Sequence, residues 1–481
     1  MQVVAHGAFY SALARAGTLV GSLAFAAILS RHVGVRGFGE YAYALSIATI
    51  CGTLVMFGLD QVAIRDLSQQ RAEPAFLFGR VLAIQGSMAA LCFVAVLGGA
   101  ALFGSAEERL IVLALVLLHT FTEQASMAFV SLFRARNRMD YEATTNWVWA
   151  ITLIAGALAG AAAGLSLGGL LALAFLAYSA RLGSVLFLVT RVLKVRDILG
   201  HVRLDGALAR GAAPLLVLGL ASIVYAAFPR LIVNARLTLH DVGLYAAAER
   251  IVQLVAGVFV IVDVVVFPLF ARHAAESRER FAATYERTAD AFLAFGLLVG
   301  LACAAVGPEI VRVLFGPAFV ASVPLFTVLF PTVSMSISGY VTMRAMISLR
   351  RDRILAAWMI TTLLIGLPLA WWAAHRWGLM GVAWAWSFPI GLGFVGFFVY
   401  LREALKLRWR QWRYAIYFAV FAASFLVSAR VQDASLGTRL LVHAAIIGSL
   451  GMLFVLTGLA RPADVRALLG SMPGASRMAR A

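Results

Sequence analysis

Long apolar stretches follow one another along the whole chain and leave only short connections between them. About fourteen of them approach or reach the roughly 20 residues that an α-helix needs to cross a ~30 Å hydrocarbon core. With 62% hydrophobic and 13% charged residues, the chain lacks the polar surface of a water-soluble protein. We therefore predict an all-α polytopic membrane protein. The predicted spans are residues 8–30, 38–59, 80–104, 110–133, 144–164, 167–190, 212–234, 243–270, 288–306, 320–345, 354–374, 378–400, 414–430 and 436–458.

Basic residues gather in every second connection between these spans. If the first span starts inside, the inside segments hold 28 of the 40 Lys and Arg residues and the outside connections hold 8. The positive-inside rule then places both termini in the cytoplasm. The net charge of +17 is explained by topology and by attraction to anionic lipid, so we do not expect nucleic acid as a partner.

The sequence offers no pattern for a cofactor, a metal or covalent catalysis. Cys51, Cys92 and Cys303 all fall within predicted spans, which leaves no disulfide framework or CxxC site. The glycine-rich turn at 34–39 lacks both the Lys-Ser/Thr ending and the preceding strand of a nucleotide-binding loop. No HExxH sequence or Ser/His/Asp set is recognisable, and no connection is long enough to form an extramembrane catalytic domain. We expect a transporter, not an enzyme.

Three weak sequence matches indicate an internal repeat. Residues 38–44 resemble 242–248, at an offset of 204, and 136–139 resemble 351–354, at 215. Residues 169–172 resemble 381–384, at 212. Because six spans separate the copies, both halves have the same topology and would be related by an axis along the membrane normal. We predict six-helix bundles at 1–205 and 206–403 around a central cavity, then two further helices and a tail at 404–481. Chance recurrence of Gly/Ala/Tyr strings is the alternative.

The region around the second span carries a family resemblance. Phe38-Gly39-Glu40-Tyr41, Gly58-Leu59-Asp60 and Ile64-Arg65-Asp66 resemble the polysaccharide-biosynthesis flippases, which move O-antigen and related lipid-linked oligosaccharides. These belong to the multidrug, oligosaccharidyl-lipid and polysaccharide exporter superfamily. The resemblance extends over nearly the whole chain. It implies fourteen helices arranged as two six-helix bundles plus two.

Four arginines lie away from the ends of the predicted spans. A charge near the centre of the bilayer costs about 2.5–3.5 kcal/mol on insertion scales. Arg15 lies on a polar stripe of the first span, which has no carboxylate. Arg181 lies too deep for easy snorkelling, Arg230 follows Pro229, and Arg250 is in the eighth span. Snorkelling is the alternative for Arg230. Because the resemblance implies that drug exporters place an acid on the first helix, its arginine predicts an anionic cargo. We expect all four arginines to bind a diphosphate.

Three carboxylates lie at comparable positions: Glu123, Glu249 and Asp263. We expect them to couple an ion such as H⁺ or Na⁺, or to balance the arginines. Glu249 and Arg250 can instead form a structural pair. Glu123 and His119 have the i, i+4 spacing of two metal ligands, but a metal would need further ligands, and an arginine partner for Glu123 is the simpler expectation.

These residues and the resemblance together lead to one hypothesis. The chain would be a bacterial inner-membrane flippase for a polyprenyl-diphosphate-linked oligosaccharide, working by alternating access. A polysaccharide polymerase and chain-length complex, together with membrane lipids, would be its partners. A lipid II flippase and a drug or cation antiporter are rivals with the same fold. A polysaccharide polymerase or ligase and an assembly scaffold are rivals from other classes.

Overall fold

The computed structural model describes residues 2–69, 72–255, 266–405, 426–427, 430–431 and 434–456. Within these ranges the chain is almost entirely helical and contains no strand. The predicted all-α fold class is therefore confirmed. The elements are α1 (Gln2–Met56), α2 (Leu59–Ser68), α3 (Pro74–Leu102), α4 (Glu107–Ala135), α5 (Met139–Ala162), α6 (Leu167–Thr190), α7 (Val195–Leu199), α8 (Gly206–Arg236), α9 (Leu239–Val255), α11 (Phe267–Glu276), α12 (Arg278–Leu314), the 3₁₀-helix η3 (Pro317–Ser322), α13 (Val323–Ser348), α14 (Asp352–Leu405) and α16 (Leu436–Leu456).

The two longest helices each bend at a glycine. Gly34 in α1 has φ 69° and ψ −174°, and Gly378 in α14 has φ 58° and ψ −138°. Glycine adopts such backbone angles readily because it has no Cβ. Each bend falls at a junction between predicted spans. α1 contains the span 8–30 and most of 38–59, and α14 contains 354–374 and 378–400.

The apolar helices are long enough to cross a membrane repeatedly. By length and composition, six helices of the described chain qualify, or nine if each of three bent helix pairs is one span. This confirms a multi-pass membrane protein, while the number fourteen stays a prediction. The predicted span 414–430 and the tail from 461 lie almost wholly outside the described residues.

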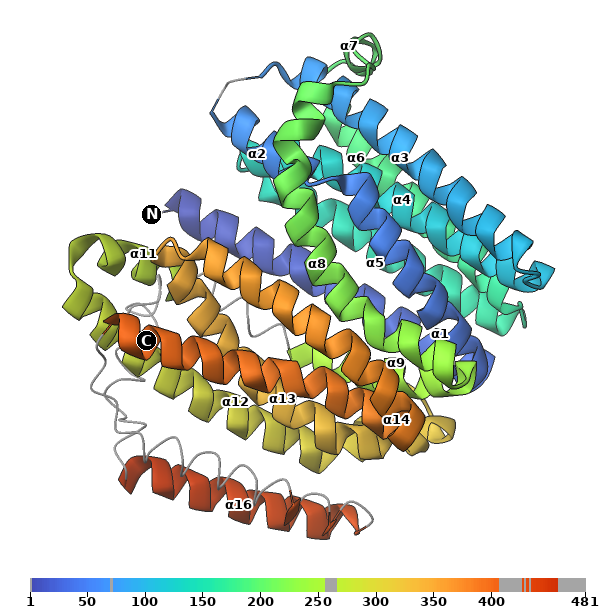
Figure 1. Cartoon of the computed structure of the whole chain (residues 1–481). Helices are drawn as coiled ribbons and strands as arrows, with labels where there is room; N and C mark the ends of the chain where they lie inside the picture. The colour runs from blue at the N-terminus through green and yellow to red at the C-terminus, as the bar shows by residue number, and fades with distance from the viewer. Residues whose placement is uncertain are drawn as a thin grey trace. The chain divides into compact units, whose positions relative to one another are not determined.

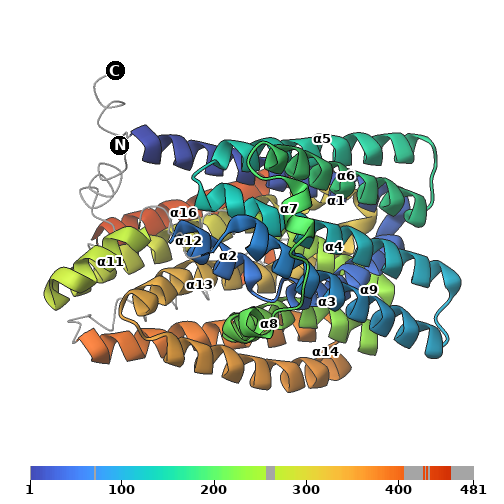
Figure 2. The ribbon, with the colours of Figure 1, turned by 90° about the horizontal axis from the view of Figure 1, so that it is seen from above.

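Contacts divide the chain into two compact units, Met1–Gly243 and Leu244–Ala481. In the first unit α1 packs along α5, α4 and α8, and α6 packs against α4 and α5. Figure 2 shows α1 running along α5. α8 therefore belongs by contact to the first unit. The repeat predicted from the sequence has its boundary at residue 205, which these contact units do not test.

The second unit is built on α12, α13 and α14, which lie side by side in Figure 1. One of its buried clusters includes Phe270 of α11, Phe281 and Tyr285 of α12, and Val341 of α13. The Tyr285 hydroxyl also lies 3.0 Å from Thr342 Oγ1, so the buried phenol has a hydrogen-bond partner. α16 packs on α12 through an ion pair between Arg439 and Glu309.

Glycines let helices of the first unit approach closely. A Cβ added at Gly21 would lie 2.8 Å from the Trp149 ring and 2.9 Å from the Ala150 Cβ. Small residues at helix interfaces allow such contact within a membrane. Gly21 thus brings α1 against α5, the helix that carries the buried Asn146.

A second close approach is reciprocal. A Cβ at Gly39 of α1 would lie 1.8 Å from the Leu239 carbonyl oxygen, and a Cβ at Gly243 of α9 would lie 2.1 Å from the Val35 carbonyl oxygen. Each glycine therefore faces the carbonyl group of the residue that lies four positions before the other glycine. The two contacts are related by the offset of 204 residues that the sequence match predicts.

Candidate functional site

Arg181 of α6 is the most deeply enclosed of the four intramembrane arginines. Its side chain is only 3% exposed, and it lies nine residues before the end of α6, about 14 Å at ~1.5 Å per residue. Its Nη2 donates to Asn146 Oδ1 at 2.7 Å, and its Nη1 donates to Glu123 Oε1 at 3.5 Å. A buried guanidinium needs such partners because charge is costly away from water.

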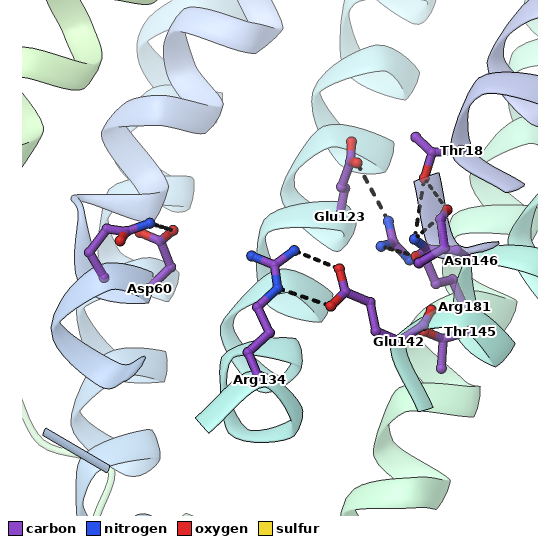
Figure 3. A network of polar contacts seen from close by, with 10 residues as sticks. Thr18, Asp60, Glu123, Arg134, Glu142, Thr145, Asn146 and Arg181 are labelled. Atoms are coloured by element: carbon purple, nitrogen blue, oxygen red, sulfur yellow. Dashed lines mark hydrogen bonds and ion pairs between the residues drawn. The ribbon is translucent and has the colours of Figure 1, made fainter. Parts of the chain in front are cut away.

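Asn146 connects Arg181 to the first helix. Its Nδ2 donates to the Ala14 carbonyl oxygen at 3.1 Å and to Thr18 Oγ1 at 3.2 Å. Figure 3 shows Glu123, Asn146 and Thr18 around Arg181. One polar network thus joins α1, α4, α5 and α6 inside the first unit.

Aromatic rings pack beside this network. His119 of α4 stacks on Tyr178 of α6 with ring centroids 4.7 Å apart and an interplanar angle of 10°. Trp149 of α5 lies 5.4 Å from the same tyrosine ring. Tyr178 precedes Arg181 by three residues and so lies near it on one side of α6. Apolar surroundings of this kind strengthen the electrostatic interactions of the guanidinium.

A separate ion pair lies one turn away on α5. Arg134, near the end of α4, donates through Nε and Nη2 to the two carboxylate oxygens of Glu142 at 3.0 and 2.6 Å. Bidentate pairs of this geometry are the strong, directional kind. Figure 3 shows this pair beside the Arg181 network. Because the pair neutralises itself, it leaves the charge of the network around Arg181 unchanged.

The other predicted arginines lie elsewhere. Arg15 on α1 is exposed and makes no hydrogen bond or ion pair with the residues that the structure describes. At ~100° per residue it is turned about 60° from Thr18, which belongs to the Arg181 network. Arg230 is partly buried on α8, which packs within the first unit.

The polar residues predicted around the eighth span belong to the second unit. Gln253 Nε2 donates to Glu249 Oε1 at 3.2 Å, and Arg250 Nη1 donates to Gln253 Oε1 at 3.3 Å. The glutamine therefore bridges the two charged residues. Asp263 lies outside the described residues.

Neither His119 nor Glu123 points to a shared metal ion. His119 stacks on Tyr178, whereas Glu123 contacts Arg181. Over the ranges that the structure describes, no three His, Cys, Asp or Glu side chains group closely enough to hold a metal.

Comparison with known proteins identifies the family. The family model described as "Polysaccharide biosynthesis protein" matches residues 4–274, which is more than half of the chain. The chain belongs to this family. Among curated proteins, none matches the sequence.

Solved structures share the fold of this polysaccharide biosynthesis protein at low sequence identity. A lipid II flippase MurJ in an inward closed conformation aligns with a TM-score of 0.69 and 13% identity, covering 94% of this chain and all of its own. An inward-facing MATE family multidrug transporter of the MOP superfamily aligns with a TM-score of 0.66 and 11% identity, covering 81% of this chain and 94% of its own. A MOP superfamily transporter from Pyrococcus furiosus with a binding pocket of reverse polarity aligns with a TM-score of 0.56 and 11% identity, covering 84% of this chain and 95% of its own. These likenesses show the fold alone.

Sequence reasoning missed two parts of this region. Asn146 was not singled out, although it is the only amide side chain in the span 144–164. An amide in an apolar span needs a hydrogen-bonding partner, and that requirement was the available signal. The Arg134–Glu142 pair was missed because both residues fall in a predicted connection, where charges are ordinary.

Proposed function

We propose that this polysaccharide biosynthesis protein is a flippase. It carries a polyprenyl-diphosphate-linked oligosaccharide, such as an O-antigen, capsule or exopolysaccharide unit, from the cytoplasmic to the periplasmic leaflet of a bacterial inner membrane. The observation that carries the proposal is the guanidinium of Arg181, which is buried within the helices and only weakly neutralised. A carboxylate at 3.5 Å in a single contact leaves much of that positive charge available to another anion.

The charges of α1 also favour an anionic cargo. Before its bend at Gly34 the helix contains Arg15 and no carboxylate. Arginine forks match phosphate oxygens in two parallel bonds, which suits a diphosphate. We assign Arg15, Arg181, Arg230 and Arg250 to the headgroup. Glu123, Glu249 and Asp263 would couple an ion or balance the arginines.

The cargo has two parts with opposite needs. A charged sugar headgroup cannot enter hydrocarbon, since an isolated ion there costs tens of kcal/mol by Born estimates. The polyprenyl tail favours lipid by ~0.8 kcal/mol per CH₂. The tail would therefore stay in the bilayer while the head passes between two bundles that rock by alternating access.

The same proposal includes a duplicated chain with bundles at 1–205 and 206–403 and an additional segment at 404–481. The reciprocal contacts of Gly39 and Gly243 support it, since they follow one offset of 204 residues. The starts of α3 at Pro74 and α12 at Arg278 differ by the same number. Each of these helices also follows a short amphipathic helix, α2 or α11.

The basic connections support cytoplasmic termini. With an inside-negative potential, an uncompensated headgroup of charge −2 is driven outward by about 4.6 kcal/mol per 100 mV. Delivery to the periplasmic leaflet would supply a polysaccharide polymerase and its chain-length complex, which we propose as partners.

The test is polysaccharide export in a bacterium that lacks its own flippase and carries this gene together with its matching glycosyltransferases. We expect the wild-type protein to restore surface polysaccharide. At equal expression, Arg181→Ala and Arg15→Ala should each give much less surface polysaccharide than wild type. Arg36→Ala is the matched control because Arg36 is an exposed arginine in the turn beside Gly34. Full export by both variants would refute the anion site.

Lipid II is a second candidate cargo, favoured by the nearly complete structural match to MurJ. It also carries a polyprenyl diphosphate, so the arginines fit it equally well. Complementation of a strain depleted of its lipid II flippase distinguishes the two. Growth rescue supports lipid II, whereas rescue of polysaccharide export alone supports the first proposal.

A further inference from the structure

The hydrogen bonds of Asn146 fix the orientation of its amide group. A backbone carbonyl can only accept, so the amide nitrogen must face Ala14. The Thr18 hydroxyl donates to the same carbonyl at 3.1 Å and can therefore accept from the amide nitrogen. The amide oxygen is left facing Arg181, whose nitrogens can only donate. Asn146 is only 4% exposed, so its amide group is enclosed by these partners and not by water.

Glu123 holds the same guanidinium in a different way. Its contact with Arg181 is a single one at 3.5 Å, and its side chain is 33% exposed. The neutral partner is thus short, buried and fixed, while the charged partner is long and partly accessible. A ligand that competes for Arg181 would displace Glu123 more readily than Asn146.

Arg181 retains donors for a competing ligand. A guanidinium has five N–H groups, and the two contacts use two of them. Its Nε is buried and has no hydrogen-bond partner among the described residues. A phosphate oxygen that took the place of the Glu123 carboxylate would find donors already held in position by Asn146.

We propose that Asn146 is the specificity-determining residue of this site: it holds Arg181 without neutralising it, and an anionic ligand then displaces Glu123 from the guanidinium. This inference rests on the proposed function, because it concerns the same site and a diphosphate ligand. It adds Asn146 as a positioning residue and gives the two neighbours of Arg181 different roles: Asn146 holds the guanidinium in place, and Glu123 gives way to the ligand. A carboxylate at position 146 would act as a permanent internal counter-ion.

The experiment measures binding of farnesyl diphosphate to the purified full-length protein in detergent. Farnesol, which has the same tail and no charge, measures binding through the tail alone. The variants are Asn146→Asp, Glu123→Gln, Asn146→Asp/Glu123→Gln and Arg181→Ala. The melting temperature of each variant reports whether it is folded.

The double variant separates position from net charge. It has the same formal charge as wild type. Its carboxylate, however, is at position 146, where it is fixed, and not at position 123, where a ligand could displace it. We expect Asn146→Asp and the double variant to bind farnesyl diphosphate about 10- to 100-fold more weakly, the range of one hydrogen bond to a charged group. Glu123→Gln should bind several-fold more tightly, and farnesol binding should not change.

Two results would overturn the inference: wild-type affinity in the double variant, or unchanged affinity in Glu123→Gln. The second result decides the matter even if Asn146→Asp fails to fold, since Glu123 is partly exposed and glutamine has the same shape. Arg181→Ala tests the proposed function separately. If that variant binds farnesyl diphosphate as tightly as wild type, Arg181 is not the anion site, whatever the Asn146 variants do.

Discussion

Replacing Gly39 by alanine should force α1 and the first turn of α9 apart. The new methyl carbon would lie 1.8 Å from the Leu239 carbonyl oxygen and 2.8 Å from the Gly243 nitrogen. A carbon and a carbonyl oxygen in contact stay about 3.3 Å apart, so α1 and the first turn of α9 must separate by about 1.5 Å. Both neighbours are backbone atoms, and no side-chain rotation can relieve the overlap.

The cost should lie at the upper end of the 1–3 kcal/mol typical of overpacking, about 3 kcal/mol. Alanine recovers up to about 1 kcal/mol through its better helix propensity. For a unit of 243 residues, a net loss of about 2 kcal/mol corresponds to a melting temperature lower by about 4–8 °C. Fluorescence-detected size-exclusion chromatography after heating measures this shift in detergent.

Gly86→Ala is the matched control. Gly86 also lies within a helix, and an added Cβ there meets nothing within 4 Å. That variant should melt at or slightly above the wild-type temperature. Gly39→Ala/Gly243→Ala should cost less than the sum of the single variants, because one separation of the helices accommodates both methyl groups. A melting temperature for Gly39→Ala within 1 °C of wild type would refute the close approach.

Three further predictions concern other parts of the chain. Arg134→Ala leaves Glu142, whose side chain is 11% exposed, without its bidentate partner. This variant should lower the free energy of unfolding by about 1–3 kcal/mol, measured as a lower melting temperature. Arg138→Ala breaks an exposed pair and should have a much smaller effect. Asp205 caps α8 and pairs with Arg80, and hydrogen bonds from the Leu208 amide, then from Arg80 and the Ala207 amide, lower its pKa below 3.8. The stabilisation that Asp205 provides is therefore present at neutral pH and is lost as the pH falls through the lowered pKa. The difference in melting temperature between wild type and Asp205→Ala should narrow below about pH 4, and a constant difference would contradict this. Green fluorescent protein fused after Ala481 should fluoresce, and alkaline phosphatase inserted at 163–166 should be active; the opposite pair of results would reverse the proposed orientation.

Hydropathy and charge were sufficient to predict the helical class, the repeated membrane crossings and the position of the α1 bend, because these depend on local composition. The isolation of a charge in an apolar span was sufficient to single out Arg181 and Glu123. The partners of these residues were harder to predict. Asn146 meets Ala14 and Thr18 where Gly21 brings α1 against α5, and it meets Arg181 where α5 packs on α6. Both contacts depend on packing between separate helices, which local composition does not specify. The contacts of Gly39 and Gly243 depend on tertiary structure in the same way.

The most direct measurement of the central claim is translocation of a fluorescent polyprenyl-diphosphate oligosaccharide in proteoliposomes that contain only this protein. Sugar reached by a membrane-impermeant oxidant outside the vesicles reports the fraction flipped over time. We predict fast exchange between leaflets with wild type, and a rate near that of protein-free vesicles with Arg181→Ala. A wild-type rate no greater than that of protein-free vesicles, under an imposed potential of either sign, would contradict the account.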